Sequence, residues 1–132
     1  MTGAAEAVQT ALVAALNDSS AIATLASGVF DGPPSRAAWP YLVIDDGATR
    51  DWSHKTARGR EHRIGVTVWD DGSSSARLQM LAREAEAAIE AMPVDLDGHR
   101  LVSLVQVQTR IVRDPDGPWA ARLTYRARTL ED

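Results

Sequence analysis

Three histidines, His54, His62 and His99, have the clearest capacity for acid–base catalysis or metal binding in this sequence. Two histidines of one helix bind a metal together when they lie about one turn apart, and no pair here has that spacing. His54 and His62 could form a site with Asp51 or Glu61. We expect instead that all three histidines are solvated residues of loops and turns.

Serine and aspartate clusters are the remaining candidates for chemistry. Ser73 to Ser75 lack the flanking glycines of a nucleophile elbow, so we interpret them as capping residues of a helix. The pairs Asp45–Asp46 and Asp70–Asp71 offer oxygens for a hard cation, but each is followed by glycine, which is typical of a turn. The chain has no cysteine and no glycine-rich phosphate loop after a strand. We therefore expect no catalytic residue, no metal and no cofactor.

Arginines are concentrated in the last predicted hairpin. Strand alternation places Arg122, Arg126 and Arg128 on one face, and we expect Arg110 of the preceding strand to stand across from them. Like charges opposite one another destabilise a sheet. This face is therefore either simply solvated, or it meets acidic groups of a neighbouring subunit or passing DNA. Because the chain is rich in Asp and Glu, a subunit contact is the preferred functional interpretation, with the lining of a DNA bore as the alternative.

A polar, glycine-containing segment at 45–60 is predicted to be a long loop or a mobile hairpin arm. It carries a tryptophan that has no obvious partner within the chain. Large exposed aromatic rings often anchor interfaces, although simple packing of the arm is an equal alternative. The candidates for contact with another subunit or with a tube are Trp52, His54, Lys55, Arg58 and Arg60.

Three helices are predicted from apolar residues at three- and four-residue spacing. The first spans 4–16 and presents Val8, Leu12 and Leu16, and the second is short and spans 20–25. The third runs to about residue 92, where a proline stops it. Its apolar stripe is Leu78, Leu81, Ala85, Ala88, Ile89 and Met92.

Four strands are predicted at 41–44, 63–69, 101–113 and 119–129. The order helix, helix, strand, strand, helix, strand, strand indicates an α+β domain of two layers, with a mostly antiparallel four-stranded sheet and the helices packed on one face. In the third strand, alternation predicts one face of Leu101, Val105, Val107 and Ile111, and an opposite face of Leu104, Gln106, Gln108 and Arg110. Ile64, Val66 and Val68 share the core face of the second strand.

Composition sets the remaining limits. The 132 residues suit a single domain over 1–132, and the net charge of −4 argues against a general nucleic-acid binder. No segment approaches the length of about 20 apolar residues that a membrane helix needs, so no membrane partner is expected.

The order and spacing of several short motifs resemble a known family. They follow an Ala/Leu-rich first helix and span nearly the whole chain: Val29-Phe30-Asp31, Pro33-Pro34, Trp39 to Ile44, Asp51-Trp52-Ser53, Gly59 to Arg63, Val66 to Trp69, Leu96 to Val102, Arg113 to Gly117 and Tyr125 to Thr129. The chain resembles phage tail completion proteins, specifically the tail terminators of long-tailed phages and gene transfer agents, with a fold like that of the lambda tail terminator.

This resemblance implies a structural protein of the particle and no catalytic residues. It implies a homohexameric ring that ends tail-tube polymerisation, contacts the tail-tube protein and the head-side connector or stopper, and lets double-stranded DNA pass through its bore. The location implied is the neck region of the tail, after assembly in the host bacterial cytoplasm. Two alternatives stay open: another head–tail joining or minor tail component, and a small-ligand-binding or enzymatic α+β domain.

Overall fold

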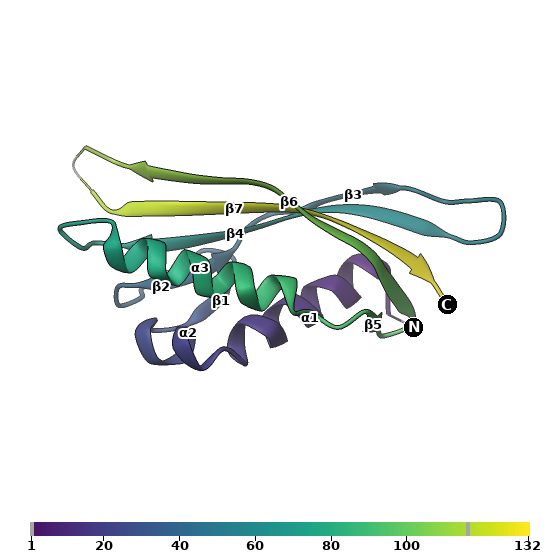
Figure 1. The fold of residues 1–132 in the computed structure, drawn as a ribbon, viewed down its shortest axis with the longest axis horizontal. Coiled ribbons are helices and arrows are strands. Elements are labelled where there is room, and N and C mark those ends of the chain that lie inside the picture. Colours follow the sequence, from purple (N-terminus) through teal and green to yellow (C-terminus); the bar gives the residue numbers. More distant parts are fainter. Residues whose placement is uncertain (1, 116) are drawn as a thin grey trace.

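A computed structural model describes residues 2–115 and 117–132 as an elongated α+β unit (Figure 1). The helices are α1 (Ala4–Asn17), α2 (Ser20–Leu25) and α3 (Ala76–Glu90). The strands are β1 (Val29–Asp31), β2 (Tyr41–Ile44), β3 (Ala48–Asp51), β4 (Gly59–Asp70), β5 (Asp95–Leu96), β6 (His99–Arg113) and β7 (Trp119–Glu131).

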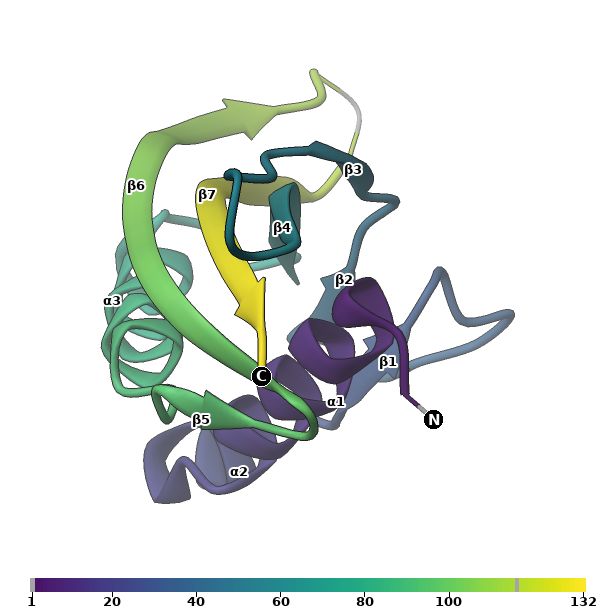
Figure 2. The ribbon, with the colours of Figure 1, turned by 90° about the vertical axis from the view of Figure 1, so that its right-hand side faces the viewer.

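The strands form one mixed sheet in the order β1-β2-β4-β7-β6-β5, with β3 paired to β4 beside β2. The β1–β2 pair is parallel and the other pairs are antiparallel. Viewed along the strands, the sheet curls strongly, and β6 bends around β7 and β4 (Figure 2). The predicted α+β class is confirmed, but the prediction of a four-stranded sheet is wrong. Strands β1, β3 and β5 are two to four residues long, too short to show a period-two pattern.

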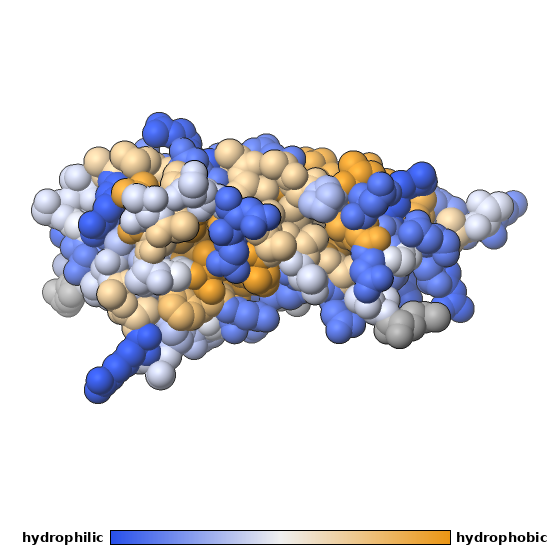
Figure 3. All heavy atoms as spheres, turned by 90° about the horizontal axis from the view of Figure 1, so that it is seen from below, coloured by the Kyte–Doolittle hydropathy of each residue, from blue (hydrophilic) through white to orange (hydrophobic). Residues whose placement is uncertain are grey.

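The helices lie together below the long strands and cover one face of the sheet, which we call the helix face (Figure 1). The core between the layers is made from the predicted stripes: Val8, Leu12 and Leu16 of α1, and Leu78, Leu81, Ala85 and Ile89 of α3, are buried. Seen from the helix side, apolar residues form a band between hydrophilic ends (Figure 3). In the described chain, no helix has the length and apolar character needed to cross a membrane.

Strands β4 and β7 follow the predicted alternation. Ile64, Val66 and Val68 of β4 are buried, as are Leu123 and Tyr125 of β7. These two strands are paired over twelve residues, from Gly59 opposite Leu130 to Asp70 opposite Trp119. Their side chains therefore divide cleanly between the helix face and the opposite, outer face.

Strand β6 departs from simple alternation, because its register against β7 shifts between Leu101 and Ser103 and again between Gln106 and Gln108. Each shift moves the following side chains to the other face. Leu104 and Gln106 therefore lie on the helix face with Leu101, opposite to the prediction, and Val105 lies on the outer face. The prediction placed Val105, Val107 and Ile111 on one face with Leu101, but Leu101 is buried and the other three are exposed.

The start of α3 is fixed by an ion pair with the end of β4. The Arg77 guanidinium binds the buried Asp70 carboxylate, with Nε and Nη2 at 2.9 and 2.5 Å from its two oxygens. Arg77 holds the pKa of Asp70 below its ordinary value. The predicted serine cap is only partly present: Ser75 occupies the N-cap position without a side-chain cap bond.

Candidate assembly surface

The outer face of the sheet carries a group of arginines from three strands, which we call the arginine face. The strand register places Arg63 of β4 opposite Arg126 of β7, and Arg110 of β6 opposite Arg122 of β7. The predicted opposition of Arg110 and Arg122 is therefore present. The arginine face consists of Arg63, Arg110, Arg122, Arg126 and Arg128, together with Glu61.

Glu61 is the buried carboxylate of the arginine face. Arg128 Nε donates to Glu61 Oε1 at 2.9 Å, Arg50 of β3 binds the other carboxylate oxygen, and Arg126 Nε lies 3.9 Å from Oε1. The hydrogen bond from Arg128, followed by Arg50, holds the pKa of Glu61 below its ordinary value despite burial. One anion thus offsets part of the repulsion among the arginines of β7.

Glu61 and Arg63 were not among the predicted surface residues. They alternate with Thr67 and Trp69 along β4, and this alternation is visible in the sequence once the strand is extended back to Gly59. The predicted arm ended at residue 60 and the predicted strand began at residue 63, so Glu61 belonged to neither element and its pairing with Arg128 was not foreseen.

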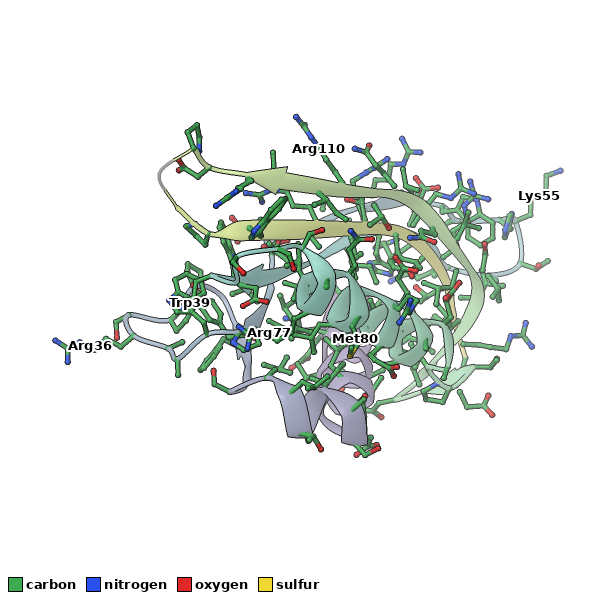
Figure 4. All side chains as sticks on the ribbon, turned by 60° about the vertical axis from the view of Figure 1, so that its left-hand side comes forward. Arg36, Trp39, Lys55, Arg77, Met80 and Arg110 are labelled. Atoms are coloured by element: carbon green, nitrogen blue, oxygen red, sulfur yellow. The ribbon has the colours of Figure 1, made fainter. Side chains whose placement is uncertain are left out.

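The other end of the arginine face is less neutralised. Arg122 lies over the Trp69 ring at 5.7 Å from its centroid, a cation–π contact that offers the guanidinium a polarisable surface but no counter-charge. Arg110 is exposed, extends away from β6 (Figure 4), and forms no ion pair within the described chain. This end therefore retains excess positive charge, although the whole chain has a net charge of −4.

The predicted arm is a hydrogen-bonded β-hairpin. Strand β3 pairs with the start of β4, and the hairpin extends beyond the helices at one end of the molecule (Figure 1). At its neck, Trp52 N donates to the Gly59 carbonyl at 2.9 Å, and Ser53 Oγ accepts from Gly59 N at 3.1 Å. A Cβ at Gly59 would lie 2.3 Å from the Trp52 carbonyl oxygen. Only glycine allows the two strands to approach this closely.

The charged residues of the arm are arranged from its neck to its tip. Arg60 Nη1 binds Asp51 Oδ1 at 3.0 Å at the neck, whereas Lys55 and Arg58 are exposed. Lys55 projects from the tip, at the opposite end of the molecule from Arg36 (Figure 4). The elongated subunit therefore presents different cationic projections at its two ends.

Trp52 connects the arm to the arginine face. Its half-buried ring packs edge-on against His54, with centroids 4.6 Å apart, and Arg128 lies over it at 5.1 Å from the centroid. The tryptophan thus has partners within the chain. The two predicted surfaces are one continuous surface, because the Arg128 side chain contacts both Trp52 and Glu61.

The histidines do not converge on a site. His62 is buried between two threonines, with Nδ1 2.9 Å from Thr49 Oγ1 and Nε2 2.9 Å from Thr129 Oγ1, and burial lowers its pKa. His99 is also buried, with Nδ1 2.9 Å from the Asp97 carbonyl. The expectation of solvated histidines is therefore wrong for His62 and His99. Within residues 2–115 and 117–132, no three His, Cys, Asp or Glu side chains are grouped as metal ligands.

The sequence of the chain was compared with models of known protein families. The family model described as tail completion protein gp17 matches residues 10–130, which is nearly the whole chain. The chain belongs to this tail completion family. It is therefore a phage tail structural component and not an enzyme, as the motifs of the sequence predicted.

Individual members show how far the likeness extends. The tail completion protein gp17 of Bacillus phage SPP1 is 25% identical over 114 residues, covering 86% of this chain and 84% of the relative. A solved structure of bacteriophage SPP1 gp17 has a TM-score of 0.67 at 22% identity, covering 94% of this chain and 89% of that one, which shows the shared fold. A chain of the virion of a native gene transfer agent particle has a TM-score of 0.77 at 27% identity, covering 98% and 99%.

Proposed function

We propose that this tail completion protein is the tail terminator, a homohexameric ring that ends tail-tube polymerisation and joins the tube to the head-side connector or stopper. The observation that carries this proposal is the continuous surface of arm and arginine face on an elongated subunit of the tail completion family. The likeness to a chain of a gene transfer agent virion supports a place in such a particle.

A ring needs two different surfaces on each subunit, because a head-to-tail contact repeats around a closed circle. The arm projects at one end of the molecule and the β6–β7 hairpin extends toward the other (Figure 1). These two features differ in shape and charge, so they suit a heterologous contact better than a symmetric dimer.

The arginine face is proposed as a subunit contact, with DNA passing elsewhere in the bore. Double-stranded DNA binds strongly to arrays of arginines through release of counterions. A bore lined by Arg110, Arg122 and Arg126 from every subunit would hold DNA tightly and oppose its transit. Acidic groups of a neighbouring subunit would instead neutralise these charges permanently.

Removal of the chain from an otherwise complete assembly system tests the proposal. A terminator controls when the tube stops growing, so particles lacking it are expected to carry tubes of irregular, excessive length by negative-stain electron microscopy. Complementation with the wild-type chain should restore a uniform length. Tubes of normal length that fail to join heads would instead identify a different neck or minor tail component.

A further inference from the structure

Strand β6 has a long edge without a backbone partner. One side of it pairs with β7 along most of its length, whereas β5 covers the other side only at His99 and Arg100. Leu101 N also donates to the Val94 carbonyl at 2.7 Å. Within the described chain, residues 102–113 have no further strand on this side. Unpaired edges invite strand addition and are usually protected by lysine, proline or bulges. This segment contains no lysine or proline, and its two register shifts are the only such feature on it.

Apolar side chains are exposed along this same edge strand. Val105 and Val107 are 44% and 45% exposed. The large hydrophobic residues exposed on β6 are Val102, Val105, Val107, Ile111 and Val112, whereas the rest of the described chain has Trp39, Met80 and Val94. A concentration of exposed apolar groups on one open strand is typical of a surface that is covered in an assembly.

Charge determines which partner fits this edge. Its distal half carries Arg110 and Arg113, both exposed. The opposite edge of the sheet, formed by β1 and β3, carries exposed Asp31 and Asp51, and its one arginine, Arg50, is bound to Glu61. Exposed Asp46 lies between β2 and β3. Two copies of β6 placed edge to edge would bring their arginines together, which is unfavourable. The edge of β6 against the opposite edge of another copy would bring arginines toward aspartates.

We infer that the outer edge of β6 pairs with the opposite sheet edge, formed by β1 and β3, of a second copy of the chain. The sheet would then continue from one subunit to the next by strand addition. The contact is head-to-tail, so it is the kind that closes into a ring. The inference rests on the proposed ring and assigns the surface that holds it together.

Lysine substitutions on the edge test the inference. Val105→Lys and Val107→Lys place a charge where pairing would bury an apolar group, and Met80→Lys on α3 is the control because Met80 is similarly exposed at 42%. Native mass spectrometry over a concentration series should show assembly weakened roughly tenfold or more by each β6 variant and unchanged by the control. Circular dichroism checks the fold of each variant.

Hydrogen exchange of the wild-type chain provides a second readout that needs no substitution. Outward-facing amides of 102–113 should exchange in the free subunit and become protected in the assembly. A ring that forms with unprotected β6 amides, and that tolerates both lysines, would overturn this inference while leaving the proposed function intact. Symmetric dimers, or protection of β6 only by the tail-tube protein, would also overturn it. A wild-type chain that never assembles, even in particles, would remove the proposed ring itself.

Discussion

The guanidinium of Arg128 lies 5.1 Å from the centre of the Trp52 ring. This contact joins the arm to the sheet, because Arg128 also binds Glu61 of β4, whose Oε1 accepts from Arg128 Nε at 2.9 Å. The orientation of the arm therefore depends on the charge state and shape of the side chains at its base.

Trp52→Ala is expected to impair assembly more than folding. The ring is only half-buried, so its loss removes the Arg128 and His54 contacts without opening a cavity in the core. We expect roughly tenfold weaker assembly by native mass spectrometry, typical of a lost aromatic anchor, and a small fall in Tm. Trp39→Ala, which removes a 40% exposed tryptophan outside the arm, is the control. Equal losses of Tm and assembly in Trp52→Ala would show that its ring is only a packing residue.

Glu61→Gln is expected to make the free subunit less sensitive to acid. Because the pKa of Glu61 is lowered on folding, its stabilising contribution is fully present above the unfolded value of 4.5 and is lost as pH falls through the folded pKa. The variant should therefore be less stable than wild type near pH 7, and the difference should narrow below pH 4.5. Thermal unfolding from pH 3 to pH 7 measures this convergence. A constant difference over the whole range would contradict it.

Asp70→Asn is expected to destabilise the junction of β4 and α3. The substitution leaves Arg77 without its charged acceptor and weakens two hydrogen bonds at a buried position. Hydrogen bonds to charged groups contribute about 1.5–3 kcal/mol to the free energy of unfolding, and a loss of that size is expected in urea denaturation. Asp71→Asn is the matched control, because Asp71 is exposed and lies 3.6 Å from Arg77. Equal losses of unfolding free energy in Asp70→Asn and Asp71→Asn would argue against a stabilising role of the Asp70–Arg77 ion pair.

Arg110→Glu is expected to stabilise the free subunit and weaken its assembly. The change replaces a like-charge cross-strand pair with Arg122 by an opposite-charge pair, and such pairs are worth about 0.2–1 kcal/mol. The same change removes a cation from the β6 edge. Urea denaturation should therefore show a higher free energy of unfolding for the variant, whereas native mass spectrometry should show weaker assembly. Arg83→Glu, an identical charge change at an exposed position of α3, should leave assembly unchanged.

Local patterns in the sequence determined the long helices and strands, in which buried and exposed positions repeat with a constant period. The stripe from Leu78 to Ile89 specifies the buried side of α3, since a long helix shows its period several times over. The alternation of Arg122, Arg126 and Arg128 specifies one face of β7 for the same reason. The family resemblance likewise followed from the order and spacing of short motifs in the sequence.

Only the tertiary structure decided the features that depend on pairing between distant residues. The first register shift of β6 exchanges the faces of Val105 and Gln106, and the second returns Gln108 and Arg110 to the face that alternation predicts. Both shifts arise from the alignment with β7 rather than from any signal within β6. His62 and Glu61 are polar residues that became buried because Thr49, Thr129 and Arg128 supply their partners. Whether a polar side chain can be buried depends on such partners, and these are known only once the sheet has brought them together.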